Sequence, residues 1–587
     1  MTDKKTQIRI AAALAGALVI YQAIDHPRAL PVGIAHWISI ALWGGVGYAL
    51  GWFCSPQARA LRHLIMLCAV GLALAVSFLN TGMFGASVTW MLSVGAFLLA
   101  FGYWIGAAAR DFFAFKPTTF GSAEWADADY LKGNNLVGPN GLSLGVFPDV
   151  DGTMMRVRYT GDRHLLTIAP TRSGKGTTAI IPNLLTYRGS ALVIDPKGEN
   201  ALITTDARLL MGQTVHIVDP WGIAAAGHAG PARFNPLDWL VAGDVDITEN
   251  AMLLADALVV PDGNGDRFWI EEAKALLQGL ILYVATDERE AGHQHLGRVR
   301  DLLLLDGEDM PVLFQRMTES IHHVVVSTGA RCLQKEEKLL ANVVASAQAQ
   351  THFLDSARIR QSLSASDFRF EDMKTQAMTI YLVLPADRLD AFGRWLRLLI
   401  QQAIIVNARN IAVQPERPIL FLLDEMPSLG RLASVEQAYR LMAGFGMQLW
   451  CIAQDASQLK ELYKDSWEGF VANSGAITYA GSRDRMTATY MSDLCGMTTV
   501  WNLSTAIARA IGTSASGSSS STTNTETRSA TQRKLAFPDE LMRLNGDRQL
   551  VFIDNHQPIM GVKRSWFADD RLKALGRNLR LEQKARS

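Results

Sequence analysis

The sequence predicts an α/β protein whose soluble part is built on a doubly wound, largely parallel sheet and follows a set of membrane helices. Three observations support this prediction: short strands that are apolar throughout, a phosphate-binding loop directly after one of them, and four long apolar runs at the N-terminus. The 587-residue chain is long enough for several modules. Lys plus Arg and Asp plus Glu both number 56, so any polyanion site must be local. The five cysteines show neither disulfide nor metal-site spacing.

Residues 1–115 are predicted to form a membrane anchor. Four apolar runs follow one another at residues 8–24, 34–53, 64–79 and 86–109, and about 20 such residues cross a bilayer. Basic residues flank these runs so that four spans leave both ends on the positive, cytoplasmic side. Two spans are the alternative, because the first and third runs are short and rich in Gly and Ala. We therefore expect a multi-pass protein of a bacterial inner membrane, in contact with lipid, with its soluble domains in the cytoplasm.

The soluble part is predicted to be one α/β domain interrupted by an all-α insertion. Eight apolar runs bounded by Gly, Pro or Asp begin near residues 164, 190, 214, 377, 418, 447, 475 and 549, as strands of a sheet covered on both faces require. Helix-forming sequence fills most of the gaps. The predicted segments are 116–237 and 373–560 for the nucleotide-binding domain, 238–372 for the all-α domain, 513–531 for a flexible Ser/Thr-rich loop, and 561–587 for a basic tail.

The strand beginning at His164 leads into a phosphate-binding loop and then a helix. Such a loop turns backbone N–H groups towards phosphate, and the helix N-terminus adds positive potential. Gly174 allows close approach, and Lys175 neutralises phosphate charge. Two positions depart from the general motif: Ala169 replaces its first Gly, and Gly176 stands where Ser or Thr would bind Mg²⁺. The candidate nucleotide-binding residues are Thr171, Arg172, Ser173, Gly174, Lys175, Gly176 and Thr177.

A second buried strand, beginning near residue 418, ends in Asp424 and Glu425. In ATPases with such a loop, the first acid holds the Mg²⁺ shell and the second polarises the attacking water. The alternative is that these acids cap the next helix. A third strand ends in Gln454, a candidate sensor of the γ-phosphate. Lys175, Glu425 and Gln454 are thus the predicted catalytic residues, and Asp195 and Glu199 are the next candidates for the catalytic carboxylate.

Several longer motifs resemble the VirD4/TraG family of type IV secretion coupling proteins: PTRSGKGTTAIIPNLL, SALVIDPKGEN, RFNPLDWL, LLDEMPSLG, IAQDASQL and RKLAFPDEL. The resemblance covers residues 120–567 and implies a RecA-like domain that carries an all-α domain, follows a transmembrane anchor and assembles as a homo-hexamer. Both departures in the loop are usual in that family. Because they leave the metal ligand open, we choose Thr177 over Thr178, with Asp424 as its partner.

The resemblance also implies an ATPase that uses ATP and Mg²⁺ to deliver relaxase-bound single-stranded DNA from a relaxosome into the secretion channel. Its expected partners include the channel ATPases and inner-membrane components. A protein-substrate receptor that moves no DNA and a DNA pump of the FtsK kind are the alternatives. In a ring, the neighbouring subunit should supply an arginine to the γ-phosphate. The candidates are Arg388, Arg394, Arg440 and Arg483.

Overall fold

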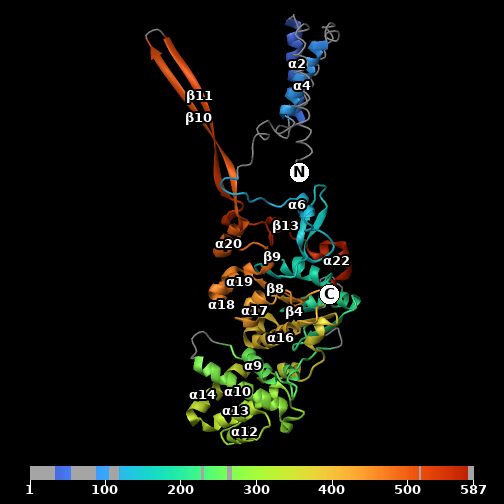
Figure 1. Ribbon diagram of the computed structural model, residues 1–587, viewed down its shortest axis with the longest axis vertical. Helices are drawn as coiled ribbons and strands as arrows, with labels where there is room; N and C mark the ends of the chain where they lie inside the picture. The colour runs from blue at the N-terminus through green and yellow to red at the C-terminus, as the bar shows by residue number, and fades with distance from the viewer. Residues whose placement is uncertain are drawn as a thin grey trace, which may run out of the picture. The chain divides into compact units, whose positions relative to one another are not determined.

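The computed structural model describes residues 34–54, 87–104, 118–225, 230–260, 267–514 and 517–579 (Figure 1). The chain divides into two compact units. The first comprises residues 1–122 and 499–533, and the second comprises residues 123–498 and 534–587.

The described part of the first unit includes the helices α2 (Ile34–Cys54) and α4 (Ser87–Trp104), which pack against each other. The rings of Trp43 and Phe97 meet edge to face at 6.3 Å. A Cβ at Gly47 would collide with the backbone of Phe97, so this glycine allows the helices to approach closely. No helix in the described part of the chain has the length and hydropathy needed to cross a membrane. The apolar runs at 8–24 and 64–79 lie outside the described residues.

A two-stranded ribbon, formed by β10 (Met497–Ser514) and β11 (Gly517–Lys534), takes the place of the predicted flexible loop at 513–531 (Figure 1). The loop was predicted because Ser and Thr are too polar to be buried. A two-stranded ribbon buries little, however, and the β-branched Thr residues are well suited to an extended backbone. The composition is therefore compatible with strands that need no core.

The second unit is built on an eleven-stranded mixed sheet with the order β2-β1-β13-β12-β9-β3-β8-β7-β4-β6-β5. The seven strands from β9 to β5 are parallel, and the four from β2 to β12 form an antiparallel extension. The parallel strands are β3 (His164–Ile168), β4 (Ala191–Asp195), β5 (Thr214–Val218), β6 (Met378–Val383), β7 (Ile419–Leu423), β8 (Met447–Ala453) and β9 (Ser474–Tyr479). The others are β1 (Leu142–Pro148), β2 (Met154–Tyr159), β12 (Arg548–Ile553) and β13 (Ile559–Val562).

Both faces of the parallel part are covered, which explains why its strands are apolar throughout. Alternate residues of β7 enter two separate cores: Phe421 belongs to one and Leu422 to the other. The first face is covered by α16 (Leu389–Arg409), α17 (Ala433–Leu441), α18 (Ala456–Tyr463), α19 (Glu468–Ala472), α20 (Arg485–Cys495) and α21 (Pro538–Met542). The second is covered by α6 (Ala128–Gly133), α7 (Ile181–Leu184) and α8 (Glu199–Leu210). A RecA-like α/β fold is thus confirmed.

Between β5 and β6 the described chain contains helices and no strand, seen as the green layer in Figure 1. Its α-helices are α9 (Ile247–Leu258), α10 (Arg267–Thr286), α11 (Leu296–Leu303), α12 (Asp309–Thr318), α13 (His323–Gln334), α14 (Glu337–Thr351) and α15 (Ala357–Ser362). Short 3₁₀ turns, Pro236–Trp239 and Phe370–Lys374, lie at its two borders. Its core is continuous with the first face of the sheet.

The predicted basic tail begins inside β13 and continues as folded structure through residue 579. A 3₁₀ turn at Trp566–Ala568 and the short helix α22 (Asp570–Leu575) follow the strand. Trp566 and Leu572 are buried against α7 and α8. The sequence predicted only a basic tail, and these two apolar residues attach its first part to the domain.

Candidate nucleotide site

Four neighbouring parallel strands, β3, β8, β7 and β4, end at one edge of the sheet. The phosphate loop follows β3, Gln454 follows β8, Asp424 and Glu425 follow β7, and Asp195 is the last residue of β4. Together with the loop after β4 and the start of α16, they surround a cavity of about 620 Å³. The three predicted catalytic positions, separated widely in the chain, therefore lie in one site.

The phosphate loop is fixed at its beginning by the sheet and at its end by a helix. Ala169 N donates to Ala453 O (2.8 Å), and Thr178 N donates to Gly174 O (2.9 Å). Gly174 has φ 89°, a conformation that an L-residue rarely adopts. The helix begins as one π-helical turn, Gly176–Ile180, and continues as α7. Ser173 Oγ is buried without a hydrogen-bond partner among the described residues, which leaves a polar group in the loop for an added ligand.

Lys175 connects the loop to the acidic pair. Its Nζ lies 2.8 Å from Asp424 Oδ1 and also contacts Glu425 Oε1. Burial favours the neutral amine, but the two carboxylates outweigh this effect and raise the pKa of Lys175. Burial also raises the pKa of Asp424, even beside Lys175. The site is therefore a half-buried cluster of one cation and two acids, in which electrostatic interactions are stronger than at the surface.

The backbone places Glu425 differently from Asp424. Glu425 has φ 54° and ψ 34°, the left-handed region that is costly for a residue with a Cβ. Its Oε2 accepts a hydrogen bond from Gln454 Nε2 at 3.1 Å, and its backbone N–H donates to Asp424 Oδ1. Local strain of this kind concentrates at functional sites. Gln454 therefore orients the carboxylate predicted to polarise water.

The side chain of Asp195 accepts a hydrogen bond from the backbone of the next helix. Its side chain is 1% exposed, and Oδ2 accepts from Ala201 N (2.9 Å) near the start of α8. Burial raises its pKa to about 7. Asp219, after β5, makes the same kind of contact with the backbone N–H groups of Ala224 and Ala225. The Asp-Pro-x-Gly sequences at the ends of both strands thus form turns that the aspartate side chains stabilise. Asp195 also lines the nucleotide cavity.

The two candidate metal-binding threonines point to different cavities. Thr177 lines the nucleotide cavity, whereas Thr178 lines a small cavity on the side of α22. Both hydroxyls donate to Gly174 O, at 3.1 and 2.9 Å. A Cβ added at Gly176 would meet nothing within 4 Å. The geometry favours Thr177 as the ligand, and steric exclusion does not explain the glycine before it.

The donor set fits Mg²⁺ better than a metal held wholly by protein. Within the described ranges, no three His, Cys, Asp or Glu side chains gather as a metal-binding group. Mg²⁺ commonly uses one or two carboxylates, with waters and substrate phosphates completing its shell. Thr177 and Asp424, both lining the cavity, supply such a partial set.

Other residues of the site were not predicted from the sequence. Ala386, Leu389 and Ser428 line the cavity, and Lys563 Nζ donates to Ser173 O at 2.9 Å. Ser428 lies within the LLDEMPSLG motif, three residues after Glu425. Ala386, Leu389 and Lys563 lie outside the motifs and reach the site only through the packing of distant segments.

The four arginine candidates differ in their surroundings. Arg394 is partly buried and donates to Gln350 within the domain. Arg388 lies over the Trp221 ring, Arg440 pairs with Glu436, and both are about half exposed, while Arg483 is also exposed.

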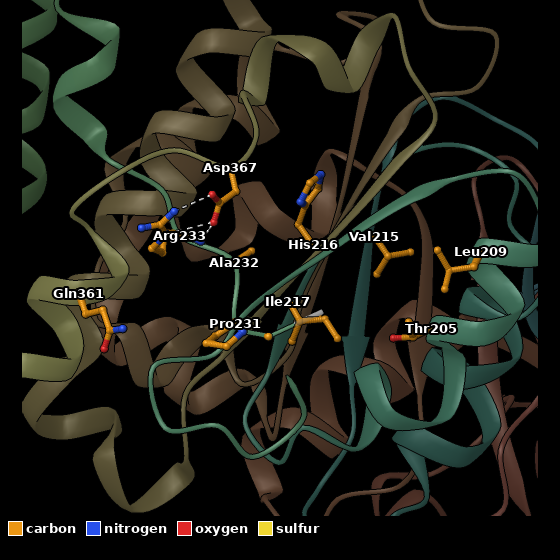
Figure 2. A pocket seen from close by; sticks show the side chains of 11 residues that line it. Thr205, Leu209, Val215, His216, Ile217, Pro231, Ala232, Arg233, Gln361 and Asp367 are labelled. Carbon is orange, nitrogen blue, oxygen red and sulfur yellow. Dashed lines mark hydrogen bonds and ion pairs between the residues drawn. The ribbon is translucent and has the colours of Figure 1, made fainter. Parts of the chain in front are cut away.

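A second cavity of about 640 Å³ lies beyond the edge strand β5. Figure 2 shows Val215, His216 and Ile217 on one side of it and the Arg233–Asp367 ion pair on the other. Asp367 accepts hydrogen bonds from the guanidinium of Arg233. Among the described residues, neither a glycine-rich loop nor an acidic pair lines the cavity. Cavity size alone does not identify the nucleotide site; the charged groups around the cavity after β3 do.

The fold and the site define an α/β protein with a phosphate-binding loop and a RecA-like sheet. The chain belongs to the family described as type IV secretory system conjugative DNA transfer, whose model matches residues 123–586. It is 26% identical over 500 residues to the conjugal transfer protein TraG of Escherichia coli, covering 76% of each chain. It is 28% identical over 476 residues to VirD4 of Agrobacterium fabrum, covering 78% of this chain and 67% of that one.

Solved structures show the same fold. The unbound conjugative coupling protein TrwBΔN70 has a TM-score of 0.55 at 17% identity, covering 76% of this chain and 95% of its own. TrwB in complex with ADP and Mg²⁺ has a TM-score of 0.55 at 16% identity, covering 76% and 94%.

Proposed function

We propose that this chain is a type IV secretion coupling protein, an ATPase that recruits a relaxase-bound single strand of DNA and drives it into the secretion channel. The observation that carries the proposal is the meeting of Lys175, Asp424, Glu425 and Gln454 around one cavity, in a chain that belongs to a conjugative DNA transfer family. The relatives are named for conjugal transfer, and TrwB structures contain a non-hydrolysable ATP analogue or ADP with Mg²⁺.

Each side chain has a defined part in hydrolysis. The loop N–H groups and Lys175 would bind the phosphates of ATP. Thr177 and Asp424 would hold Mg²⁺, which would supply positive charge against the developing negative charge. Glu425 accepts a proton from, or polarises, the attacking water, while Gln454 fixes the direction of that carboxylate. These groups act by position and charge, as phosphoryl transfer requires.

We further propose that residues 1–115 anchor the protein in a bacterial inner membrane, with the soluble domains in the cytoplasm, and that six copies form a ring. The four apolar runs and their flanking basic residues support the anchor. The close approach of α2 and α4 at Gly47 is the kind of small-residue contact common between membrane helices. The relaxosome, the channel ATPases and the inner-membrane components are the proposed partners.

Purified full-length protein in detergent tests the central proposal. We expect Mg²⁺-dependent ATP hydrolysis that single-stranded DNA stimulates, and no hydrolysis by Lys175→Ala. Absence of hydrolysis in both proteins would overturn the ATPase assignment. If a secreted protein stimulated ATP hydrolysis and single-stranded DNA did not, the chain would instead be a protein-substrate receptor.

A further inference from the structure

A lysine from the C-terminal part of the chain contacts the phosphate loop. Lys563 directly follows β13, and its Nζ donates to Ser173 O at 2.9 Å. Its own backbone N–H donates to Asp547 O at 2.7 Å, which ties its main chain to the start of β12. The side chain thus extends from a strand of the antiparallel extension to the loop that follows β3.

This contact fixes the direction of one peptide group in the loop. The carbonyl of Ser173 and the N–H of Gly174 belong to the same peptide, and in a trans peptide they point in opposite directions. Since Lys563 holds the carbonyl from the side of the C-terminal segment, the Gly174 N–H faces the other side of the loop. That side borders the cavity, where Gly174 and Lys175 are lining residues. Backbone N–H groups at this place are the usual phosphate donors.

The lysine is held firmly enough to act in this way. Trp566 and Leu572 pack against Ile181 and Ile203, the faces of α7 and α8 nearest the segment. Asp569 forms an ion pair with Arg156 on β2. Burial lowers the pKa of Lys563, consistent with an ammonium removed from bulk water. Because β13, which directly precedes Lys563, pairs with β12, and these contacts follow it, the segment is anchored on both sides of the residue that contacts the loop.

We infer that Lys563 is a positioning residue of the nucleotide site, which acts through the Ser173 carbonyl to present the Gly174 N–H to the phosphates of ATP. The inference rests on the proposed ATPase function. It makes nucleotide affinity dependent on the C-terminal segment, because displacing that segment removes the donor that orients the loop. The lysine itself does not touch the nucleotide, in contrast to Lys175.

The test uses full-length protein carrying Lys563→Met, which keeps the length and loses the donor, and Lys563→Arg, which keeps a charged donor. Lys573→Met, an exposed lysine of α22, is the matched control. Because an oriented N–H contributes to substrate and transition state alike, KM and the Kd of a fluorescent ATP analogue should rise about tenfold in Lys563→Met while kcat stays within about twofold. Lys563→Arg should stay within about threefold of the wild-type values, and Lys573→Met should match them.

If Lys563 only stabilised the fold and did not orient the phosphate loop, the variants would give different results. Lys563→Met would then lower the Tm and leave KM and Kd unchanged, a result that would overturn the inference. If Lys563→Met does not fold, Lys563→Ala, which also lacks a donor, replaces it, and a wild-type KM in that variant would overturn the inference equally. Failure of the proposed function is separate: wild-type protein would then neither bind nor hydrolyse ATP, and Lys175→Ala would not differ from it.

Discussion

The ammonium of Lys175 lies 2.8 Å from Asp424 Oδ1, so the residue that ends the phosphate loop and the residue that follows β7 are joined by an ion pair. Glu425 shares the same cation. Three charged side chains that follow β3 and β7 are therefore linked by ion pairs. Substitution of each should have a distinct effect on nucleotide binding and hydrolysis.

Lys175→Ala should reduce ATP hydrolysis by at least about a hundredfold, because loss of one charged donor to a developing phosphate charge typically costs that much. The measurement is phosphate release by full-length protein, with Lys460→Ala, an exposed lysine of α18, as the control. Wild-type turnover in a folded Lys175→Ala protein would contradict the assignment of the loop.

Asp424→Asn should weaken ATP binding about tenfold when Mg²⁺ is present and leave it unchanged in EDTA, since a neutral amide is a poorer ligand for a hard cation. The change is measured by titration with a fluorescent ATP analogue under both conditions. Equal weakening with and without Mg²⁺ would show that Asp424 acts through Lys175 and not through the metal.

Glu425→Gln should bind ATP as the wild type does and hydrolyse it about a hundredfold more slowly, because the amide keeps the size and loses the basicity of the carboxylate. The ATP-bound protein should then accumulate as rings, detectable by size-exclusion chromatography with light scattering. Glu461→Gln on the exposed side of α18 is the control. Normal hydrolysis in Glu425→Gln would place the catalytic carboxylate elsewhere, with Glu199, which lines the same cavity, as the next candidate.

The raised pKa of Asp195 predicts that the stability of the protein depends on pH. Its pKa rises from 3.8 to about 7 on folding, so between these values the folded state binds more protons than the unfolded state. Stability from this group is therefore full below pH 3.8 and declines as the pH rises to about 7. Asp195→Asn cannot ionise, so its Tm relative to the wild type should increase from pH 5 to 7 and level off above 8. A constant difference, like that expected for the exposed Asp465→Asn, would contradict the prediction.

The sequence located the parallel strands because complete burial demands uninterrupted apolar runs, and seven of the eight predicted runs are the seven parallel strands. The eighth, which begins near residue 549, is β12 of the antiparallel extension. The order of these strands was not accessible in the same way. Nothing in the residues around 191 and 447 states that β4 and β8 both lie beside β7. Strand adjacency depends on long-range packing, which leaves no local pattern.

The residues of the site also fall into those that local motifs predict and those that only long-range packing brings together. Lys175, Asp424 and Gln454 were predicted because each follows a strand within a short motif. Lys563 was counted only as one charge of a basic tail, since its contact with Ser173 arises from three-dimensional packing. The ribbon β10–β11 was missed for the opposite reason: its composition has no apolar run, and its strands pair only with each other.

The strand order also affects how the protein is made. During synthesis β3 leaves the ribosome long before β8 and β9, the strands that flank it in the finished sheet. A chain interrupted before residue 447 has no neighbour for either edge of β3, and one interrupted before residue 563 lacks the lysine that holds the loop. Because domains complete their non-local contacts last, the nucleotide site is complete only when almost the whole polypeptide has emerged.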